Sequence, residues 1–266
     1  MSKRARKKLE HKERRIERRD KMLDHDFSSE RATLEEVFDQ ATRMVIYGFF
    51  NRGVLFEVHG VVNAGKEARI YWGKNREGKD LAVKIYLTSS AEFRKGMLKY
   101  IEGDYRFKGV KKDTRSLIYT WAQKEFRNLQ QAFQAKVRVP EPIAVKDNVL
   151  VMEFIGENGV HALSLKEQPP EKPSETYDRL LKYLALLYGK AKLVHGDLSE
   201  FNIMFWEGVP IIFDVSQAVP KNHPLADELL LRDINNLNRF FGSHGVEVVN
   251  VDKIYQWITN GNKSLR

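Results

Sequence analysis

Two short segments in the second half of the sequence carry side chains that could transfer a phosphoryl group. In residues 195–202 (HGDLSEFN), Asp197 is followed five positions later by Asn202. Further along, the apolar run 210–213 ends at Asp214. A short turn with this spacing can aim an aspartate and an asparagine at one phosphate, so that the aspartate orients or deprotonates the acceptor and the asparagine binds a metal.

Magnesium is the metal that these residue types favour. It prefers hard oxygen ligands and keeps several waters, so one carboxylate, one amide and the phosphates of ATP suffice to hold it. We therefore predict Asn202 and Asp214 as metal ligands and Asp197 as the proton acceptor. Each segment alone is weak evidence, because Asp and Asn are common in loops. The two segments together, each preceded by apolar residues, are a strong signal.

A lysine inside an apolar run gives the third element of this chemistry. Lys84 lies in residues 81–86 (LAVKIY), and a buried ammonium is costly unless an anion meets it. We predict that Lys84 contacts the phosphates of ATP and pairs with Glu125 from a helix of the same lobe. The alternatives are an edge-strand lysine that faces solvent and, for Glu125, an ordinary helical glutamate.

Two further segments would complete a nucleotide site. Gly65 and Lys66 stand between two β-like runs, where backbone amides could reach phosphate oxygens and the lysine could add charge. There is one glycine here, where a standard kinase loop has three. Residues 149–156 are typical of a strand that leads into an interlobe hinge, with the Glu153 carbonyl and the Ile155 amide as adenine contacts. The alternative is a plain buried strand.

The order of elements around these residues is strands first and helices later. Hydrophobic periodicity and turn residues predict an initial helix capped by Thr33, a long loop, and further strands and helices. The ranges are: helices 33–48, 115–135, 174–191, 224–242 and 251–260, strands 54–59, 68–73, 81–87, 143–146 and 149–154, and a mobile loop over 88–115.

This order predicts an α+β, bilobal protein-kinase-like fold, with a small β-rich N-lobe, a mostly helical C-lobe and a nucleotide cleft between them. We place the boundaries by composition and by the change from strands to helices. They define a basic N-terminal tail (1–30), a helical extension (31–50), the N-lobe (51–155) and the C-lobe (156–266).

The net charge of +9 is concentrated at the N-terminus, because residues 1–21 hold eleven Lys or Arg and only four acids. Such a run can pair with phosphates, which favours ribosomal RNA as a partner, although a solvated tail has the same composition. Cysteine is absent, so thiolate metal sites are excluded. No apolar run is long enough to span a membrane and the N-terminus lacks a signal-peptide centre, so we expect a cytoplasmic protein without a membrane partner.

These segments together resemble the RIO family of atypical protein kinases, and within it the first subfamily. The resemblance runs from about residue 33 to 260, and the chain departs from it at residues 63–64, where the family more often has Ser-Thr. The matching motifs are GKEA (65–68), AVKIY (82–86), GDYRF (103–107), KEFRNL (124–129), MEFIG (152–156), HGDLSEFN (195–202) and DVSQAV (214–219).

The resemblance implies an ATP- and Mg²⁺-dependent serine/threonine kinase, without an activation segment or substrate-binding helices, that acts in maturation of the small ribosomal subunit. It implies Asp197 as catalytic base, Asn202 and Asp214 as metal ligands, and Lys84, Glu153 and Ile155 as ATP contacts. It also implies ATPase activity with Asp214 as phosphoryl acceptor, and Mn²⁺ as an alternative metal. Autophosphorylation is expected, with these candidates: Ser89, Ser90, Thr114 and Ser116.

Three alternative functions share part of this pattern. Small-molecule phosphotransferases of the aminoglycoside or choline kinase type also use His-Gly-Asp with a later Asn, but GKEA (65–68) does not suit them. A small kinase of the tRNA-modification complex shares the same loop. A ribonucleoprotein assembly scaffold could use ATP binding as a conformational latch, and the intact Asp197, Asn202 and Asp214 argue against a catalytically dead form of it.

Overall fold

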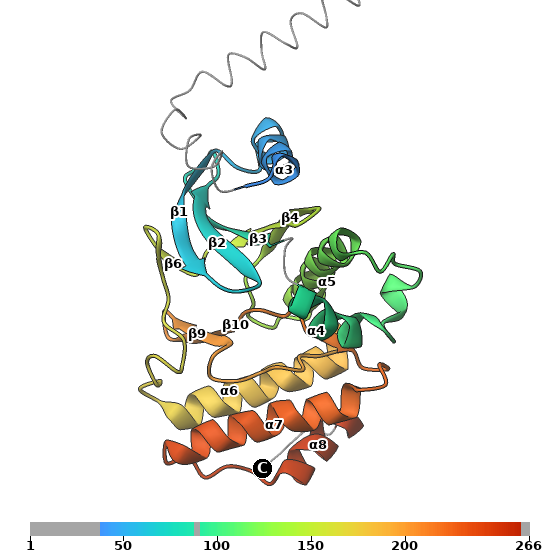
Figure 1. Ribbon diagram of the computed structural model, residues 1–266. Coiled ribbons are helices and arrows are strands. Elements are labelled where there is room, and N and C mark those ends of the chain that lie inside the picture. Colours follow the sequence, from blue (N-terminus) through green and yellow to red (C-terminus); the bar gives the residue numbers. More distant parts are fainter. Residues whose placement is uncertain (1–37, 88–90, 262–266) are drawn as a thin grey trace, which may run out of the picture.

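The N-terminal lobe is built on one antiparallel sheet. The computed structural model describes residues 38–87 and 91–261 (Figure 1). Five strands pair in the order β1-β2-β3-β5-β4, and every pairing is antiparallel. Their bounds are β1 Glu57–Ala64, β2 Ala68–Lys74, β3 Asp80–Tyr86, β4 Pro142–Lys146 and β5 Val149–Glu153.

The central strand β3 places its side chains alternately on the two faces of the sheet. Leu81, Val83 and Ile85 belong to a core cluster shared with helix α3 (Gln40–Asn51), whereas Tyr86 belongs to the larger cluster on the other face. Lys84 alternates with Val83 and Ile85 and therefore lies on the second face, which is covered by α5 (Thr114–Gln134). The period of two thus fixes which face receives the lysine.

Helix α3 begins later than the sequence predicts. The backbone amide of Thr42 donates to Asp39 Oδ1 at 2.8 Å, so Asp39 is the N-cap and the helix starts at Gln40. A carboxylate at this position satisfies one of the free amides of the first turn. The predicted cap, Thr33, lies outside the described residues. The predicted strand 54–59 also starts and ends too early, since β1 extends to Ala64.

The prediction of a loop over residues 88–115 is wrong for most of that range. Helix α4 covers Ala91–Ile101, and a short 3₁₀ turn, η1, covers Tyr105–Phe107. Met97, Tyr100 and Ile101 recur at helical spacing and are buried. Gly96 and Lys99 beside these positions hide the period in the sequence, and burial against α5 and the C-lobe stabilises the helix.

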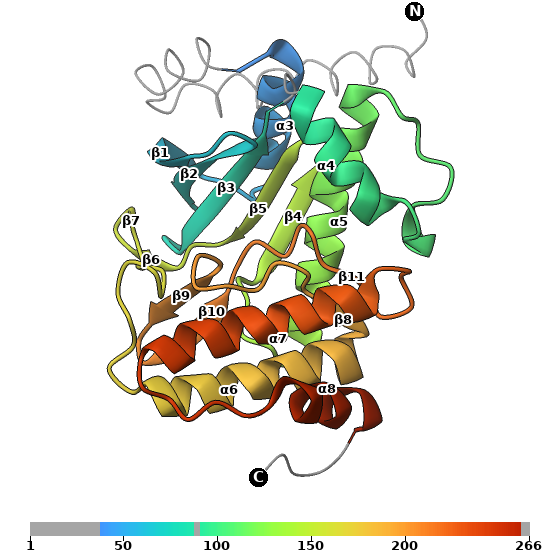
Figure 2. The same ribbon diagram turned by 60° about the horizontal axis from the view of Figure 1, so that its bottom comes forward.

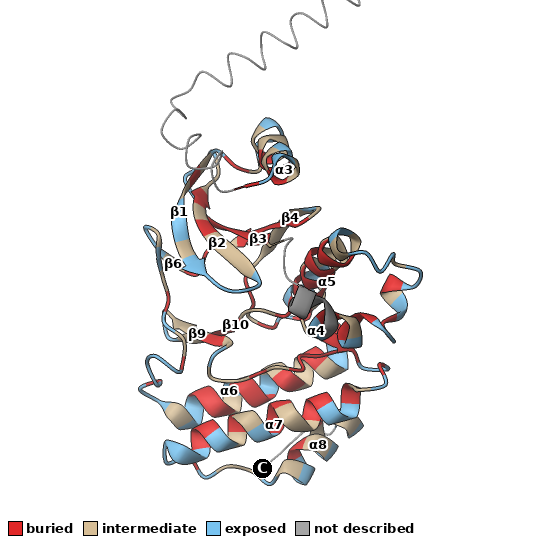
Figure 3. Ribbon diagram, viewed as in Figure 1, coloured by how far each residue is buried: buried red, intermediate tan, exposed pale blue. Residues whose placement is uncertain are grey.

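The C-terminal lobe is mainly helical, as predicted. Helices α6 and α7 lie side by side with α8 beneath them, and buried positions form the inner stripe of each helix (Figures 2 and 3). Short strand pairs β6/β7, β9/β10 and β8/β11 occupy the connection to the sheet and the edge that faces it. The bounds are α6 Pro173–Leu186, a π-helical turn η2 Leu187–Ala191, α7 Ala226–Ser243, α8 Val251–Asn260, β6 Gly156–Glu157, β7 Val160–His161, β8 Leu193–Val194, β9 Ile203–Trp206, β10 Val209–Ile212 and β11 Val219–Pro220.

The two lobes thus follow the predicted order of strands and helices. The residue boundaries at 30, 50 and 155 stay predictions. Across residues 38–87 and 91–261, we find no helix with the length and apolar character needed to cross a membrane.

Candidate active site between the lobes

The structure brings Lys84, Glu125 and Asp214 together from three separate elements. Lys84 Nζ lies 2.9 Å from Glu125 Oε1 and 3.4 Å from Asp214 Oδ1. Lys84 is 6 % exposed and Glu125 is fully buried. The lysine therefore bridges the N-lobe helix α5 and Asp214, which stands two residues after the end of β10. The predicted pairing of Lys84 with Glu125 is present, and the alternative of a solvent-facing lysine does not describe this position.

The charges at this junction stabilise one another. Burial disfavours the ammonium of Lys84, but Asp214 and Glu125 outweigh burial and raise the lysine's pKa. Burial likewise opposes the Asp214 carboxylate, but Lys84 and the Ser216 hydroxyl outweigh it and lower the pKa of Asp214. The side chain of Asp214 is 41 % exposed, so a charged carboxylate is accessible from solvent.

Glu125 behaves differently from Asp214. Burial, with Asp214 as a second cause, raises the pKa of Glu125 to about 7, although Lys84 acts in the opposite direction. The hydroxyl of Tyr86, two residues after Lys84 on β3, donates to Glu125 Oε2. The sequence does not single out Tyr86, which is an ordinary apolar-strand residue until the fold places Glu125 beside it.

We expect Glu125→Gln to flatten the pH dependence of stability. A glutamate with a pKa near 4.3 when unfolded and about 7 when folded binds more protons in the folded state within that window. Its contribution is present below the unfolded pKa and is lost as pH rises through the folded pKa. As pH rises through this window, the wild-type free energy of unfolding should fall by a few kcal/mol, at about 1.4 kcal/mol per pKa unit. Melting curves recorded from pH 4 to 8 test this. The same dependence of melting temperature on pH in wild type and in Glu125→Gln would contradict it.

The catalytic-loop residues also converge. Asn202 Nδ2 donates to the Asp197 backbone carbonyl at 2.8 Å and to Asp197 Oδ2 at 3.2 Å. Gln217 Nε2 donates to the same carboxylate oxygen at 3.1 Å. Burial, with Asp214 as a further cause and Arg232 opposing, raises the pKa of Asp197. A raised pKa makes the carboxylate a better proton acceptor, which suits the predicted role.

A buried aspartate on α7 holds the loop in place. Asp233 Oδ2 accepts from the Gly196 amide and Asp233 Oδ1 accepts from the Leu198 amide, both at 2.8 Å. Asp197 lies between these two anchored residues. Burial raises the pKa of Asp233 to about 7 against the effect of the two amides. Sequence reasoning missed Asp233, because it stands in an ordinary amphipathic helix with no local motif.

Asp233→Ala should destabilise the protein by about 2–5 kcal/mol, because two buried amides lose their acceptor and each unsatisfied group costs about 1–3 kcal/mol. Urea unfolding measures the change. The control is Glu228→Ala, which removes an exposed carboxylate from the first turn of the same helix and should cost less than about 1 kcal/mol. Equal losses in the two variants would show that Asp233 does not hold the loop.

The predicted adenine contacts lie where β5 leaves the sheet. The Glu153 amide donates to the Glu141 carbonyl at 2.9 Å, and the Ile155 carbonyl accepts from Ala162 at 2.9 Å. The Glu153 side chain forms a two-point ion pair with Arg138 at 2.7 and 2.8 Å, which fixes the strand end. The groups assigned to adenine are the other two, the Glu153 carbonyl and the Ile155 amide, and that assignment stays a prediction.

The turn between β1 and β2 contains the predicted phosphate contacts Gly65 and Lys66. The Gly65 amide donates to the Ala68 carbonyl at 3.0 Å, so this amide closes the turn. Lys66 is exposed. Glu67, which the sequence analysis did not select, interacts electrostatically with Lys84 and Asp214, and burial followed by Asp214 raises its pKa. Contacts of Gly65 and Lys66 with phosphate stay predictions.

The donor set fits magnesium. Both contacts of the Asn202 amide nitrogen go to Asp197, so the amide oxygen is the atom of this side chain that could bind a metal together with the Asp214 carboxylate. These are hard oxygen donors. Within the described ranges no group of three or more His, Cys, Asp or Glu side chains could hold a metal. Mg²⁺ at such a site would take water and phosphate oxygens as its further ligands.

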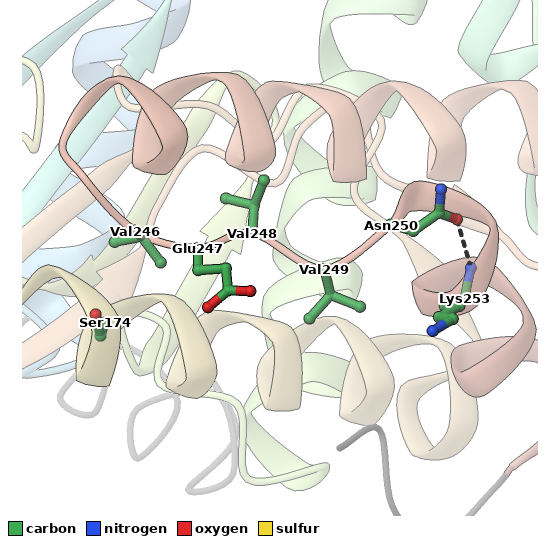
Figure 4. A pocket seen from close by; sticks show the side chains of 7 residues that line it. All are labelled: Ser174, Val246, Glu247, Val248, Val249, Asn250 and Lys253. Atoms are coloured by element: carbon green, nitrogen blue, oxygen red, sulfur yellow. Dashed lines mark hydrogen bonds between the residues drawn. The ribbon is translucent and has the colours of Figure 1, made fainter.

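A cavity elsewhere on the C-lobe is separate from this site. Its volume is about 590 Å³, and it lies between the start of α6 and the segment that leads into α8 (Figure 4). None of the predicted site residues lines it. The lining residues are Ser174, Val246, Glu247, Val248, Val249, Asn250 and Lys253.

A five-stranded N-lobe sheet, a helix whose glutamate pairs with the β3 lysine, and an Asp-Asn loop on a helical lobe define a bilobal, protein-kinase-like fold. Comparison with known proteins gives the family. The RIO domain matches residues 69–254, and the chain belongs to the RIO domain family. The predictions of fold and family are thereby confirmed.

Named relatives come from eukaryotes and archaea. The chain is 40 % identical over 236 residues to human serine/threonine-protein kinase RIO1, covering 87 % of this chain and 41 % of the human protein. It is 39 % identical over 245 residues to the RIO-type serine/threonine-protein kinase Rio1 of Haloferax volcanii, covering 89 % and 83 %. The chain thus spans about two fifths of the length of the human relative.

A solved structure shares the fold. The Rio2 kinase of Chaetomium thermophilum, in an ADP/Mg²⁺-phosphoaspartate complex, superposes with a TM-score of 0.60 at 23 % identity. The match covers 79 % of this chain and 64 % of that one.

Proposed function

We propose that this protein is an ATP- and Mg²⁺-dependent atypical serine/threonine protein kinase with ATPase activity. The observation that carries the proposal is the junction in which Lys84 bridges Glu125 and Asp214 at 2.9 and 3.4 Å. A lysine held in this way is placed to bind phosphates, and the carboxylate beside it is placed to bind a metal. The relatives named as serine/threonine-protein kinases support the same activity.

In the proposed reaction, the acceptor hydroxyl oxygen bonds to the γ-phosphorus of ATP while the bond from that phosphorus to the bridging oxygen breaks. ADP leaves, and Asp197 takes the hydroxyl proton. Bound Mg²⁺ would neutralise charge on the phosphates. Asn202 and Asp214 would hold the metal, Lys84 would hold phosphate, and Gln217 keeps Asp197 oriented through its 3.1 Å contact.

The ATPase activity is proposed to use Asp214 as the acceptor. A carboxylate oxygen would bond to the γ-phosphorus, ADP would leave, and water would then release phosphate and restore the aspartate. Exposure of the Asp214 side chain to solvent supports this role, as does the phosphoaspartate named for the Rio2 structure. For autophosphorylation, Thr114 and Ser116 lie in the first turn of α5. The other candidates, Ser89 and Ser90, are outside the described residues.

The experiment that tests the proposal is turnover of γ-labelled ATP, with Mg²⁺ and with a chelator, alone and with purified small-subunit precursors. We expect label on a protein hydroxyl and as free phosphate, both lost on chelation, with Mn²⁺ as a substitute metal. Rapid turnover on a small alcohol without protein labelling would favour a small-molecule phosphotransferase. No turnover under any condition would favour a nucleotide-binding assembly factor.

We further propose a cytoplasmic role in maturation of the small ribosomal subunit, with residues 1–21 binding ribosomal RNA. This segment lies outside the described residues, and its charge supports the proposal: eleven basic and four acidic residues. A protein with these eleven residues changed to glutamine should bind ribosomal RNA more weakly and with a shallower dependence on salt, because fewer counterions are released. Filter binding from 50 to 300 mM salt measures both. An unchanged salt dependence of the affinity would indicate that the segment is a solvated tail that does not bind the RNA.

A further inference from the structure

A buried lysine lies next to Glu125 on α5 and has no part in the proposed chemistry. Lys124 is 0 % exposed. Its ammonium donates to the Ser216 carbonyl at 2.8 Å and to the Ala218 carbonyl. In the described part of the chain, no carboxylate lies within ion-pair distance of it. Burial, followed by Arg106, lowers its pKa well below the ordinary value. A buried amine is costly without hydrogen bonds, and here two backbone carbonyls supply them.

One turn later, a second buried polar side chain reaches the same segment. Asn128 Nδ2 donates to the Val215 carbonyl at 2.8 Å and to the Ala218 carbonyl at 2.9 Å. Residues four apart lie on one face of a helix. Lys124 and Asn128 therefore form a single row of donors along α5, and three carbonyls of the segment 215–218 point at that row.

The same segment presents its side chains to the active site. Asp214, immediately before it, has a left-handed backbone with a φ of 55°. The Ser216 hydroxyl donates to Asp214 Oδ1 at 2.6 Å, and Gln217 donates to Asp197 at 3.1 Å. Non-glycine residues in this backbone region are held there by their surroundings. Anchoring the carbonyls on α5 supplies such a constraint on the backbone after Asp214.

Helix α5 thus supports the site twice. Glu125 holds Lys84 on β3. Lys124 and Asn128, one helical turn apart, hold the segment after Asp214. We propose that Lys124 and Asn128 are positioning residues, which set the direction of the Asp214 carboxylate by fixing the carbonyls of residues 215–218. This inference rests on the proposed function, in which Asp214 binds Mg²⁺.

The test compares wild type with Lys124→Met and Asn128→Leu, which keep side-chain size and remove the donors. Calorimetry measures the affinity for a non-hydrolysable ATP analogue with and without Mg²⁺. We expect the gain in affinity from Mg²⁺ to fall by about tenfold or more in each variant, as is typical when groups that orient a metal ligand are lost. Affinity without metal should change less than about twofold, because the Lys84–Glu125 pair remains.

The control is Ile118→Ala, a fully buried residue of the same helix. It should lower the melting temperature and leave the gain from Mg²⁺ unchanged, which separates positioning from general stability. If Lys124→Met does not fold, Asn128→Leu carries the test. If the folded variants gain as much nucleotide affinity from Mg²⁺ as wild type does, this inference alone is overturned. Absence of any gain in wild type would overturn the inference and the proposed function together.

Discussion

Replacing Asp214 with asparagine should reduce Mg²⁺-dependent ATP turnover by about 10³-fold or more. The substitution removes the carboxylate that lies 3.4 Å from Lys84 and accepts from Ser216 at 2.6 Å. A neutral amide binds Mg²⁺ more weakly than the carboxylate it replaces and cannot accept a phosphoryl group. Loss of one preorganised charged group in a cleft is worth about 10²–10³ in rate, and loss of the acceptor adds to it.

The measurement is release of labelled phosphate together with labelling of protein. Asp227→Asn is the matched control, since Asp227 is an exposed carboxylate on α7, and it should retain wild-type turnover. Binding of ATP without metal should survive in Asp214→Asn because Glu125 still pairs with Lys84. Turnover within tenfold of wild type would remove Asp214 from both proposed roles.

Asp197→Asn should reduce transfer to a protein hydroxyl by about 10²–10⁴-fold, the range typical of a lost general base. The asparagine keeps an oxygen for Gln217 and Asn202 but cannot take a proton. Because burial raises the pKa of Asp197, wild-type transfer should also decline as pH falls through that pKa, when the carboxylate becomes protonated. The residual activity of Asp197→Asn should lack this decline.

A pH series of initial rates on the same acceptor checks both statements. The Mg²⁺-dependent affinity for nucleotide should be nearly unchanged in Asp197→Asn, since Asp214 and Asn202 are the proposed metal ligands. A rate loss that comes entirely from weaker nucleotide binding would assign Asp197 to binding and leave the base unidentified.

Spacing along the chain predicted the parts of the site that a single segment contains. The five-residue interval from Asp197 to Asn202 places both side chains on one turn, and in the structure Asn202 donates to the Asp197 carboxylate at 3.2 Å and to its backbone carbonyl at 2.8 Å. Period-two alternation in β3 likewise predicts Lys84 on one face of the sheet. The lysine's cost in an apolar strand indicated that an acid would meet it.

Long-range partners could be predicted only where a motif named them. Glu125 was selected by its place in a predicted helix, and it does pair with Lys84. Asp233 was missed because its function depends on two amides more than thirty residues away. Helix α4 was missed because its apolar positions are few and gain stability from burial against other elements.

The sequence by itself therefore indicated the order of most strands and helices and the family, and it named candidate residues for binding ATP and a metal. These follow from local spacing, periodicity and the chemistry of each side chain. Only the tertiary structure decided that one helix, α5, supports both Lys84 and the segment after Asp214. The reason is physical: Lys124 and Asn128 donate to backbone carbonyls about ninety residues away. Every residue carries a backbone carbonyl, so residue types do not reveal which carbonyls act as acceptors.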